Sequence, residues 1–311
     1  MLRALFGNGA FTVFTSGHVI GERYRVRSEL GEGSGGEVYE VLDLRTGAVL
    51  ALKIQQPRYL ESTNSYGLYG EDARHEIALG TSLGGIDGVV TPLDFGDHLG
   101  RAYFVMDRVD GFDLSEFVAR AQPVSSVRSA AVLVQLCTAL HQVHTRGFVH
   151  RDIKLENALI SRRGLVTLID LGSSVPSGED PGIPAGTFGY LAPEAASLGV
   201  VETSLDMFSA GCLLFRMLTM EFPFLNETGY AMAHRPLPVD KLVNVDPVVR
   251  RVCVAMLEWD PADRPTAAEV RDELSSVLPD ASSPAPPRLS HDPVRWWWER
   301  LQRQERVPMS S

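Results

Sequence analysis

The sequence predicts an α+β protein with a small antiparallel β lobe followed by a larger, mainly helical lobe. Between residues 20 and 110, short runs of alternating apolar residues are separated by turn signals such as Arg45-Thr46-Gly47, which is the pattern of antiparallel strands. After Asp110-Gly111 the apolar residues recur at helical spacing as far as residue 278. The small lobe is therefore expected over residues 20–110 and the large lobe over residues 111–278.

Five strands and one helix are expected in the small lobe. The strands cover residues 24–30, 38–42, 49–54, 89–95 and 103–109, and the helix covers residues 71–83. In the large lobe one helix is expected over residues 114–121, and one face of a longer helix is marked by Val132, Leu136, Ala139, Leu140 and Val143. Residues 1–19 form an N-terminal extension whose apolar alternation could add a strand or a short packed segment.

Composition narrows the class of protein. A chain of 311 residues with 44% hydrophobic residues can bury a full-sized core. The net charge of -10 and the absence of a Lys/Arg block argue against nucleic-acid and lipid-surface partners. Three isolated cysteines fit small core residues in a reducing compartment, and no apolar run approaches the roughly 20 residues of a membrane helix. We expect a soluble, cytoplasmic protein without a membrane span.

The composition changes near the C-terminus. Residues 279–293 form a Pro/Ser-rich segment that is expected to be a linker, and residues 294–311 contain three consecutive tryptophans, Trp296 to Trp298. Two interpretations remain open for this Trp-rich segment. It could dock on the chain's own domain or on a partner protein, or it could be a loosely ordered tail.

The run Val149 to Asn157 carries an acid, a base and an amide within a few residues. Asp152 can orient a hydroxyl group, Lys154 can neutralise a phosphoryl group, and Asn157 can hold a metal ion. These are the needs of phosphoryl transfer.

A glycine-rich loop lies between the first two expected strands. Residues 30–38 fit the pattern G-x-G-x-x-G-x-V, with Gly31, Gly33 and Gly36 at the glycine positions. Glycines let backbone N–H groups approach phosphates closely, although many such hairpins are only turns. A strand follows this loop, which argues against a dinucleotide-binding fold.

Lys53 on the next strand could bridge two phosphates of a nucleotide, although an isolated lysine on a strand is more often a solvated charge. Its expected partner is a carboxylate on the following helix. Glu71, Asp72 and Glu76 compete for this role, and Glu76 is preferred because Leu83, two turns later, lies on the same face.

Taken in order, these motifs resemble a eukaryotic-type (Hanks-type) serine/threonine protein kinase, and more narrowly the soluble members found in bacteria. The resemblance covers residues 20–278 and implies the two-lobed protein kinase fold. It also implies Mg-ATP as the cofactor, with Mn²⁺ as an alternative metal. Asp152 would be the catalytic base, Asn157 and Asp170 would hold the metal, and Lys53 with Glu76 would position the phosphates.

The nucleotide-binding residues follow from the same resemblance. Met106 matches the gatekeeper, Asp107 to Val109 match the hinge, Asp113 would reach the ribose hydroxyls, and Leu159 would floor the adenine. The remaining positions around the adenine and phosphates are Leu30, Gly31, Gly33, Gly36, Val38 and Ala51. Plain core packing is the alternative for Met106 and Leu159.

Two features resemble serine/threonine kinases in particular. Lys154 stands two residues after Asp152, and residues 186–194 match G-T-x-x-Y-x-A-P-E, which resembles a peptide-docking segment. Protein substrates are therefore expected, including the chain itself. Leu171 replaces the commoner Phe after Asp170, and this change leaves the metal ligand untouched.

Several further residues have expected structural or regulatory roles. Asp206 resembles a brace for the catalytic loop, and Arg264 is expected to pair with Glu194. Gly80 replaces an apolar residue, which suggests a lost packing contact and a mobile helix. Regulation could act through a phosphate on Ser173, Ser174 or Ser177, or through permanent charge on Glu179 or Asp180.

The sequence thus favours an active serine/threonine protein kinase with a signalling role. The alternative is a catalytically slow kinase-fold scaffold that binds partner proteins, which degraded motifs would support. Gly80 is the single departure of that kind in the motifs.

Overall fold

The computed structural model describes residues 13–33, 36–55, 73–182, 185–196, 199–224 and 236–305. The chain divides into two compact units. The β-rich unit comprises the chain up to Thr81 together with Pro92–Arg108, and the helical unit comprises Ser82–Thr91 and the chain from Val109 onward. Residues 82–91, which were expected in the small lobe, therefore belong with the helical unit.

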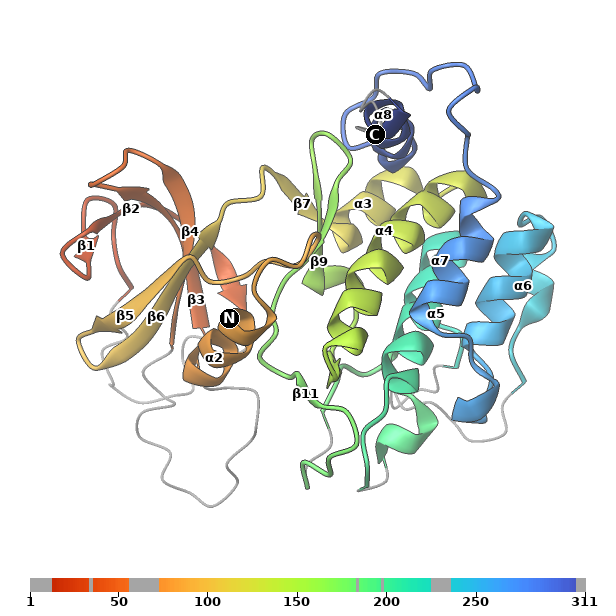
Figure 1. Ribbon diagram of the computed structural model, residues 1–311, viewed down its shortest axis with the longest axis horizontal. Helices are drawn as coiled ribbons and strands as arrows, with labels where there is room; N and C mark the ends of the chain where they lie inside the picture. Colours follow the sequence, from red (N-terminus) through yellow and green to blue (C-terminus); the bar gives the residue numbers. More distant parts are fainter. Residues whose placement is uncertain are drawn as a thin grey trace, which may run out of the picture. The chain divides into compact units, whose positions relative to one another are not determined.

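The described part of the β-rich unit contains a six-stranded antiparallel sheet (Figure 1). Its strands are β1 (Val19–Ile20), β2 (Tyr24–Gly33), β3 (Gly36–Asp43), β4 (Val49–Gln55), β5 (Asp94–His98) and β6 (Arg101–Asp107), in the spatial order β1-β2-β3-β4-β6-β5. The helix α2 (Ala73–Leu83) follows β4 in the chain. Glu71 and Asp72, the other candidate partners of Lys53, lie outside the described residues.

The strand expected over residues 89–95 is shifted. The structure begins β5 at Asp94, and Val89 instead forms an isolated bridge with Leu168 in the helical unit. Pro92 lies between these two pairings, and a proline has no N–H to donate to a sheet. The first part of the apolar run at residues 89–93 therefore pairs with Leu168, and the strand that follows it pairs with β6.

The N-terminal extension packs into the β-rich unit from residue 14 onward. Phe14 is 3% exposed, and its backbone N–H donates to the Tyr39 hydroxyl at 3.2 Å. The guanidinium of Arg101 lies over the Phe14 ring and forms a buried ion pair with Glu37 at 2.8 Å. Glu37 directly follows Gly36, so the extension packs on the strand that leaves the glycine-rich loop, on the face opposite Val38.

The helical unit is built around the long helix α4 (Ser126–Thr145). Its other described helices are α3 (Leu114–Ala121), α5 (Ser204–Thr219), α6 (Pro247–Met256), α7 (Ala267–Ser275) and α8 (Pro293–Glu305). Short strands complete the unit: β7 (Gly111–Asp113), β9 (Ala158–Ser161) and β10 (Val166–Leu168) form a three-stranded sheet, while β8 (Phe148–Val149) pairs with β11 (Val175–Pro176). Single turns of 3₁₀ helix occur at Leu155–Asn157, Pro193–Ala196, Val239–Leu242 and Pro261–Asp263.

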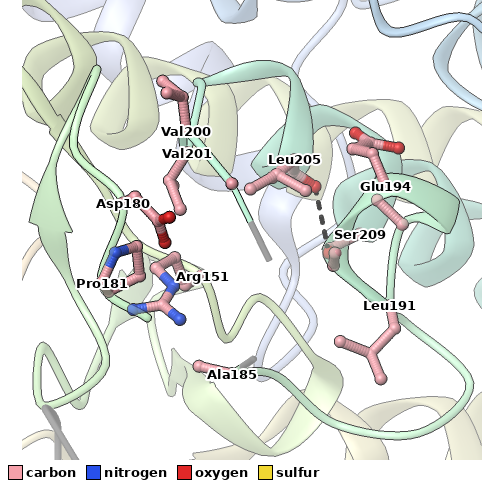
Figure 2. A pocket seen from close by; sticks show the side chains of 13 residues that line it. Arg151, Asp180, Pro181, Ala185, Leu191, Glu194, Val200, Val201, Leu205 and Ser209 are labelled. Carbon is pink, nitrogen blue, oxygen red and sulfur yellow. Dashed lines mark hydrogen bonds between the residues drawn. The ribbon is translucent and has the colours of Figure 1, made fainter. Parts of the chain in front are cut away.

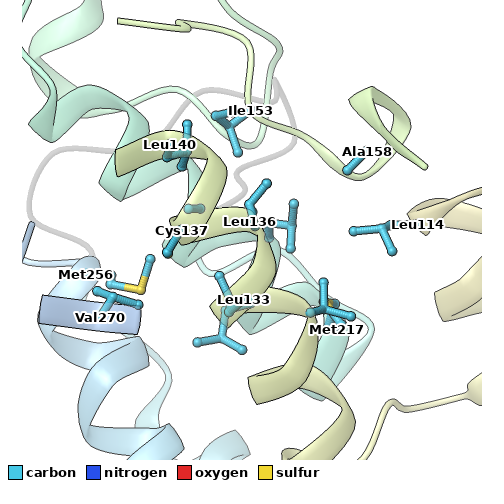
Figure 3. Close-up of a cluster of buried hydrophobic side chains, with 14 of the residues drawn as sticks. Leu114, Leu133, Leu136, Cys137, Leu140, Ile153, Ala158, Met217, Met256 and Val270 are labelled. Atoms are coloured by element: carbon cyan, nitrogen blue, oxygen red, sulfur yellow. The ribbon is translucent and has the colours of Figure 1, made fainter. Parts of the chain in front are cut away.

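Apolar side chains of α4 form the centre of the core of this unit. Leu133, Leu136 and Leu140 are fully buried and lie among side chains from α5, α6 and α7 (Figure 3). The three cysteines are all buried, and burial raises the pKa of Cys137 to about 12. They are therefore inert core residues, as expected.

The Trp-rich segment forms the helix α8, which packs on the chain's own helical unit beside α4 (Figure 1). Val294 and Trp297 lie against the core, and the indole N–H of Trp297 donates to the Pro279 carbonyl at 3.1 Å. The indole N–H of Trp298 donates to the Ser283 carbonyl at 3.0 Å. The interpretation as a loosely ordered tail is wrong for residues 294–305. Residues 279–290 are largely exposed, and the linker stays a prediction.

No helix within the described residues is both long enough and apolar enough to cross a membrane.

Gly80 is a site of close packing in the β-rich unit. A Cβ atom at this position would lie 2.2 Å from Cδ of Pro92, so glycine allows the chain at Pro92 to lie directly against α2. The expectation that glycine removes a packing contact here is wrong, because the contact is made by Pro92.

Replacing Gly80 by Leu is expected to lower the free energy of unfolding by about 1–2 kcal/mol. A Cβ only 2.2 Å from Cδ of Pro92 places this change in the upper part of the usual overpacking cost of about 1–3 kcal/mol, at about 2–3 kcal/mol, and the gain in helix propensity offsets about 1 kcal/mol. The control is Ala78→Leu, because Ala78 is exposed on the same helix and its replacement should change stability by less than about 0.5 kcal/mol. Urea denaturation of both variants measures the difference, and a Gly80→Leu protein as stable as wild type would contradict the close packing.

Candidate active site

The catalytic loop is fixed by a buried carboxylate. Asp206 on α5 is 0% exposed and accepts hydrogen bonds from the backbone N–H groups of His150 and Arg151, each at 2.8 Å. The side chain of His144 lies 2.8 Å from the same carboxylate. Burial alone would raise the pKa of Asp206, but the His144 hydrogen bond and neighbouring donors outweigh it and hold the pKa below its usual range. The expected brace is therefore present in the structure.

The backbone at Arg151 depends on this brace. Its φ of 69° is left-handed, a conformation that is uncommon for residues other than glycine. Asp170 has a similar φ of 68°, and its carboxylate accepts the N–H of Gly172 at 3.2 Å. Such strain persists only where surrounding contacts fix it, and it gathers at functional sites.

Asp152 is the centre of a hydrogen-bonded cluster. Its Oδ1 accepts the Thr187 hydroxyl at 2.7 Å, and its Oδ2 accepts Lys154 Nζ at 2.7 Å. Lys154 also donates to the Thr187 hydroxyl oxygen at 2.9 Å. Thr187 thus contacts both Asp152 and Lys154. A hydroxyl group can therefore lie between the Asp152 carboxylate and the Lys154 ammonium.

Asn157 is oriented by the same carboxylate. Its amide nitrogen donates to Oδ2 of Asp152 at 2.8 Å and to the Asp152 carbonyl at 2.9 Å. The amide oxygen is therefore the atom of Asn157 that suits a cation. Together with the carboxylate of Asp170, it offers the hard oxygen donors that Mg²⁺ prefers, so these residues fit the metal that the family implies.

Lys53 and Glu76 form a buried ion pair inside the β-rich unit. Lys53 Nζ lies 2.6 Å from Glu76 Oε2, and both side chains are 8% exposed. The predicted pairing is confirmed. The pair joins β4 to α2 and fixes the position of the Lys53 ammonium group. The alternative of a solvated surface lysine is therefore wrong.

The other predicted nucleotide residues of the β-rich unit lie on neighbouring strands. Val38 pairs with Lys53 across β3 and β4, and Ala51 pairs with Met106 across β4 and β6. Gly31 has a left-handed φ of 156°, and a Cβ at Gly36 would lie 2.9 Å from the Ile54 carbonyl oxygen. Leu30 is exposed at the start of the loop, Gly33 pairs with Gly36, and Asp107 ends β6.

In the helical unit, Asp113 and Leu159 face each other across β7 and β9. Asp113 has a role that the sequence analysis missed, because it caps α3 by accepting the Glu116 N–H at 2.9 Å and the Ser115 hydroxyl at 2.5 Å. Both bonds end on Oδ1. Val109 is partly buried just before β7.

The segment between Asp170 and Glu194 lines a cavity that also contains Arg151 (Figure 2). Ser174 is 0% exposed, and the Ser177 hydroxyl donates to the Glu202 carboxylate at 3.0 Å. Asp180 lines the cavity together with Arg151. Of the candidates for negative charge, Asp180 is thus the one that the structure places in the same cavity as Arg151.

A two-pronged ion pair fixes the end of this segment. Arg264 donates through Nη1 and Nη2 to the two carboxylate oxygens of Glu194, at 2.5 and 2.9 Å. Arg264 also donates to the backbone carbonyls of Glu258, Ser204 and Trp259, and its guanidinium lies 4.8 Å from the centre of the Phe208 ring. The predicted pairing with Glu194 is confirmed.

The chain matches the model of the protein kinase domain over residues 24–274. The chain belongs to the protein kinase family. The chain is 29% identical over 292 residues to the probable serine/threonine-protein kinase CE0033 of Corynebacterium efficiens, covering 86% of this chain and 43% of that protein. It is also 29% identical over 293 residues to the serine/threonine-protein kinase PknB of Mycolicibacterium smegmatis, covering 89% of this chain and 46% of that protein.

A third relative is the serine/threonine-protein kinase pkn3 of Myxococcus xanthus, which is 27% identical over 283 residues, 84% of this chain and 51% of that protein. This chain therefore spans about half the length of these relatives. The family assignment confirms the resemblance and the α+β kinase fold with its β-rich and helical units.

Two supporting residues of the kinase site were missed from the sequence. His144 sits at the end of α4 and is brought to Asp206 only by the packing of α4 against α5. Arg216 on α5 donates to the Tyr190 hydroxyl at 2.6 Å. Neither residue belongs to a short sequence motif. Their contacts arise only when the helices pack against their neighbours, so the sequence carried no signal for them.

Removing Arg264 is expected to destabilise the kinase fold. The Arg264 side chain is 0% exposed, and Arg264→Ala would leave the half-buried Glu194 without its partner, at a cost of about 3–5 kcal/mol. Arg251→Ala is the control because its pair with Glu273 is exposed and should be worth about 0–1 kcal/mol. Equal losses for the two variants in urea denaturation would show that the Glu194 pair is not a structural anchor.

Proposed function

We propose that this protein is a serine/threonine protein kinase that transfers the γ-phosphate of Mg-ATP to Ser/Thr hydroxyls of proteins, including its own chain. The observation that carries this proposal is the cluster of Asp152, Lys154 and Thr187, in which a hydroxyl group lies within 2.7 Å of Asp152 and 2.9 Å of Lys154. The names of the relatives, all serine/threonine-protein kinases, point the same way.

In this proposal Asp152 orients the acceptor hydroxyl and takes its proton as the oxygen attacks the γ-phosphorus. The bond from that phosphorus to the β,γ-bridging oxygen breaks, and ADP leaves with the bridging oxygen. The Thr187 hydroxyl occupies one oxygen of the carboxylate and would be displaced or would share it with the acceptor. Lys154 donates to the other oxygen of that carboxylate at 2.7 Å and can neutralise charge on the phosphoryl group during transfer. Catalysis then consists mainly of positioning and electrostatic stabilisation.

The nucleotide would be held by residues of both the β-rich and the helical parts of the sequence. Lys53, anchored by Glu76, would bind phosphate oxygens, and backbone N–H groups at Gly31, Gly33 and Gly36 would cover them. Asn157 and Asp170 would hold the metal, which neutralises phosphate charge when bound. Met106, Asp107, Val109 and Ala51 would contact the adenine, Leu30, Val38 and Leu159 would enclose it, and Asp113 would bind the ribose.

We further propose Ser/Thr acceptors in protein substrates, use of Mn²⁺ in place of Mg²⁺, and a cytoplasmic, signalling role. The β-rich and helical units would then serve as the two lobes of the kinase. The scaffold alternative lacks a supporting observation. A slow kinase-fold scaffold would be free to lose the pairs Lys53–Glu76 and Asp152–Asn157, and both pairs are intact.

The test is transfer of labelled γ-phosphate from Mg-ATP to the chain itself and to a generic basic protein. Asp152→Asn is expected to lower kcat by about 10²–10⁴-fold, because the amide cannot accept the proton. The control is Asp263→Asn, which changes an exposed carboxylate on a distant 3₁₀ turn and should leave transfer unchanged. An Asp152→Asn protein with the wild-type rate would contradict the proposal, as would a folded, ATP-binding wild type without transfer.

A further inference from the structure

The segment before α8 is attached to the three-stranded sheet β10-β9-β7. The ring of His291 lies against the ring of Phe112 on β7, with 4.2 Å between ring centres and an angle of 33°. The backbone N–H of His291 donates to the Arg162 carbonyl at 2.9 Å, and its carbonyl accepts Arg128 Nη2 of α4 at 3.4 Å. His291 is therefore held through both its ring and its backbone.

The neighbouring residue makes an equally close contact. A Cβ atom at Gly164, in the turn between β9 and β10, would lie 2.0 Å from the Asp292 carbonyl oxygen. Gly164 has a φ of 84°, so the turn itself also requires glycine. Asp292 is 5% exposed, with its carboxylate 3.9 Å from Arg128. The backbone at Asp292 therefore packs directly against the backbone at Gly164, with no room for a side chain between them.

Phe112 connects this contact to the nucleotide-binding residues. Successive side chains of a strand point to opposite faces, so the face of β7 that carries Phe112 is opposite the face that carries Asp113. Arg120 of α3 also packs on the Phe112 ring, at 4.2 Å, while Asp113 caps that same helix. Fixing the Phe112 ring therefore fixes the strand from which Asp113 projects, together with Leu159 opposite it.

We propose that His291 is a positioning residue for nucleotide binding: by packing on Phe112, the segment that precedes α8 sets the position of Asp113 for the ribose hydroxyls. This inference rests on the proposed function, because it assumes that Asp113 contacts the ribose. The segment before α8 would then contribute to nucleotide binding, although it lies outside the residues 24–274 that match the family model. Preorganisation of this kind acts on affinity through the geometry of the contacting residue.

The measurement compares the dissociation constants of ATP and of 2′,3′-dideoxy-ATP, which lacks the ribose hydroxyls. In wild type, ATP is expected to bind more tightly, and the ratio of the two constants reports the ribose contact alone. His291→Ala is expected to reduce that ratio about two- to tenfold, the range that an aromatic contact supports. A merely structural effect would weaken both ligands equally and leave the ratio unchanged.

Three further variants make the experiment decisive. His291→Phe keeps a ring against Phe112 and should restore the ratio, while Arg303→Ala, an exposed residue on α8, should not change it. Asp113→Ser keeps a helix-capping side chain but shortens its reach, and should bring the ratio to about one.

The outcomes separate the two levels of the argument. A reduced ratio in Asp113→Ser with an unchanged ratio in His291→Ala would overturn the role of His291 and leave the kinase proposal standing. A wild-type ratio near one would overturn the ribose assignment of Asp113 and with it the role of His291. Loss of phosphoryl transfer is not used in either comparison, so a failure of the proposed activity would be seen separately.

Discussion

The candidate active site depends on one buried carboxylate. Asp206 has no exposed surface, and a charge in that position is tolerated only when hydrogen bonds compensate for the lost water. His144 and the backbone N–H groups of His150 and Arg151 supply that compensation. The same bonds hold the left-handed turn at Arg151, and Asp152 is the next residue. The position of the proposed catalytic base is therefore fixed from the core of the helical unit.

The two ends of the described chain are part of this organisation. In the β-rich unit, Phe14 packs on Arg101, which pairs with Glu37 on β3 directly after the glycine-rich loop. In the helical unit, His291 and Asp292 hold β7 and the β9–β10 turn. Each terminal segment thus packs behind strands that carry proposed nucleotide-binding residues, and both extend beyond the match to the kinase domain model.

Much of the site could be predicted because its parts are close in sequence. Asp152, Lys154 and Asn157 lie on one short loop, so their spacing already limits how they can meet. The Lys53–Glu76 pair could be chosen because helical periodicity fixes which face of α2 points inward. The family resemblance added the pairing of Arg264 with Glu194, which no local pattern contains.

The remaining features depend on contacts between distant segments. Helix propensity alone makes Gly80 unfavourable. It does not reveal that Pro92, a residue outside the helix, packs against this position. The packing of α8 depends on carbonyl groups of Pro279 and Ser283 that receive the indole N–H groups, and a Pro/Ser-rich composition does not reveal this. The capping role of Asp113 was masked by its expected function, although an aspartate before an apolar helix is a common capping signal.

The most direct test of the central claim is the rate of phosphoryl transfer by Asp206→Asn. The amide in this variant would place an N–H group against the donors that now bond to the carboxylate. Losing hydrogen bonds to a charged group should lower kcat roughly ten- to hundredfold. The account predicts this loss in a folded protein whose affinity for ATP is nearly unchanged, since Lys53 and Glu76 are not touched. A folded Asp206→Asn protein with the wild-type kcat would show that the catalytic loop does not depend on this carboxylate.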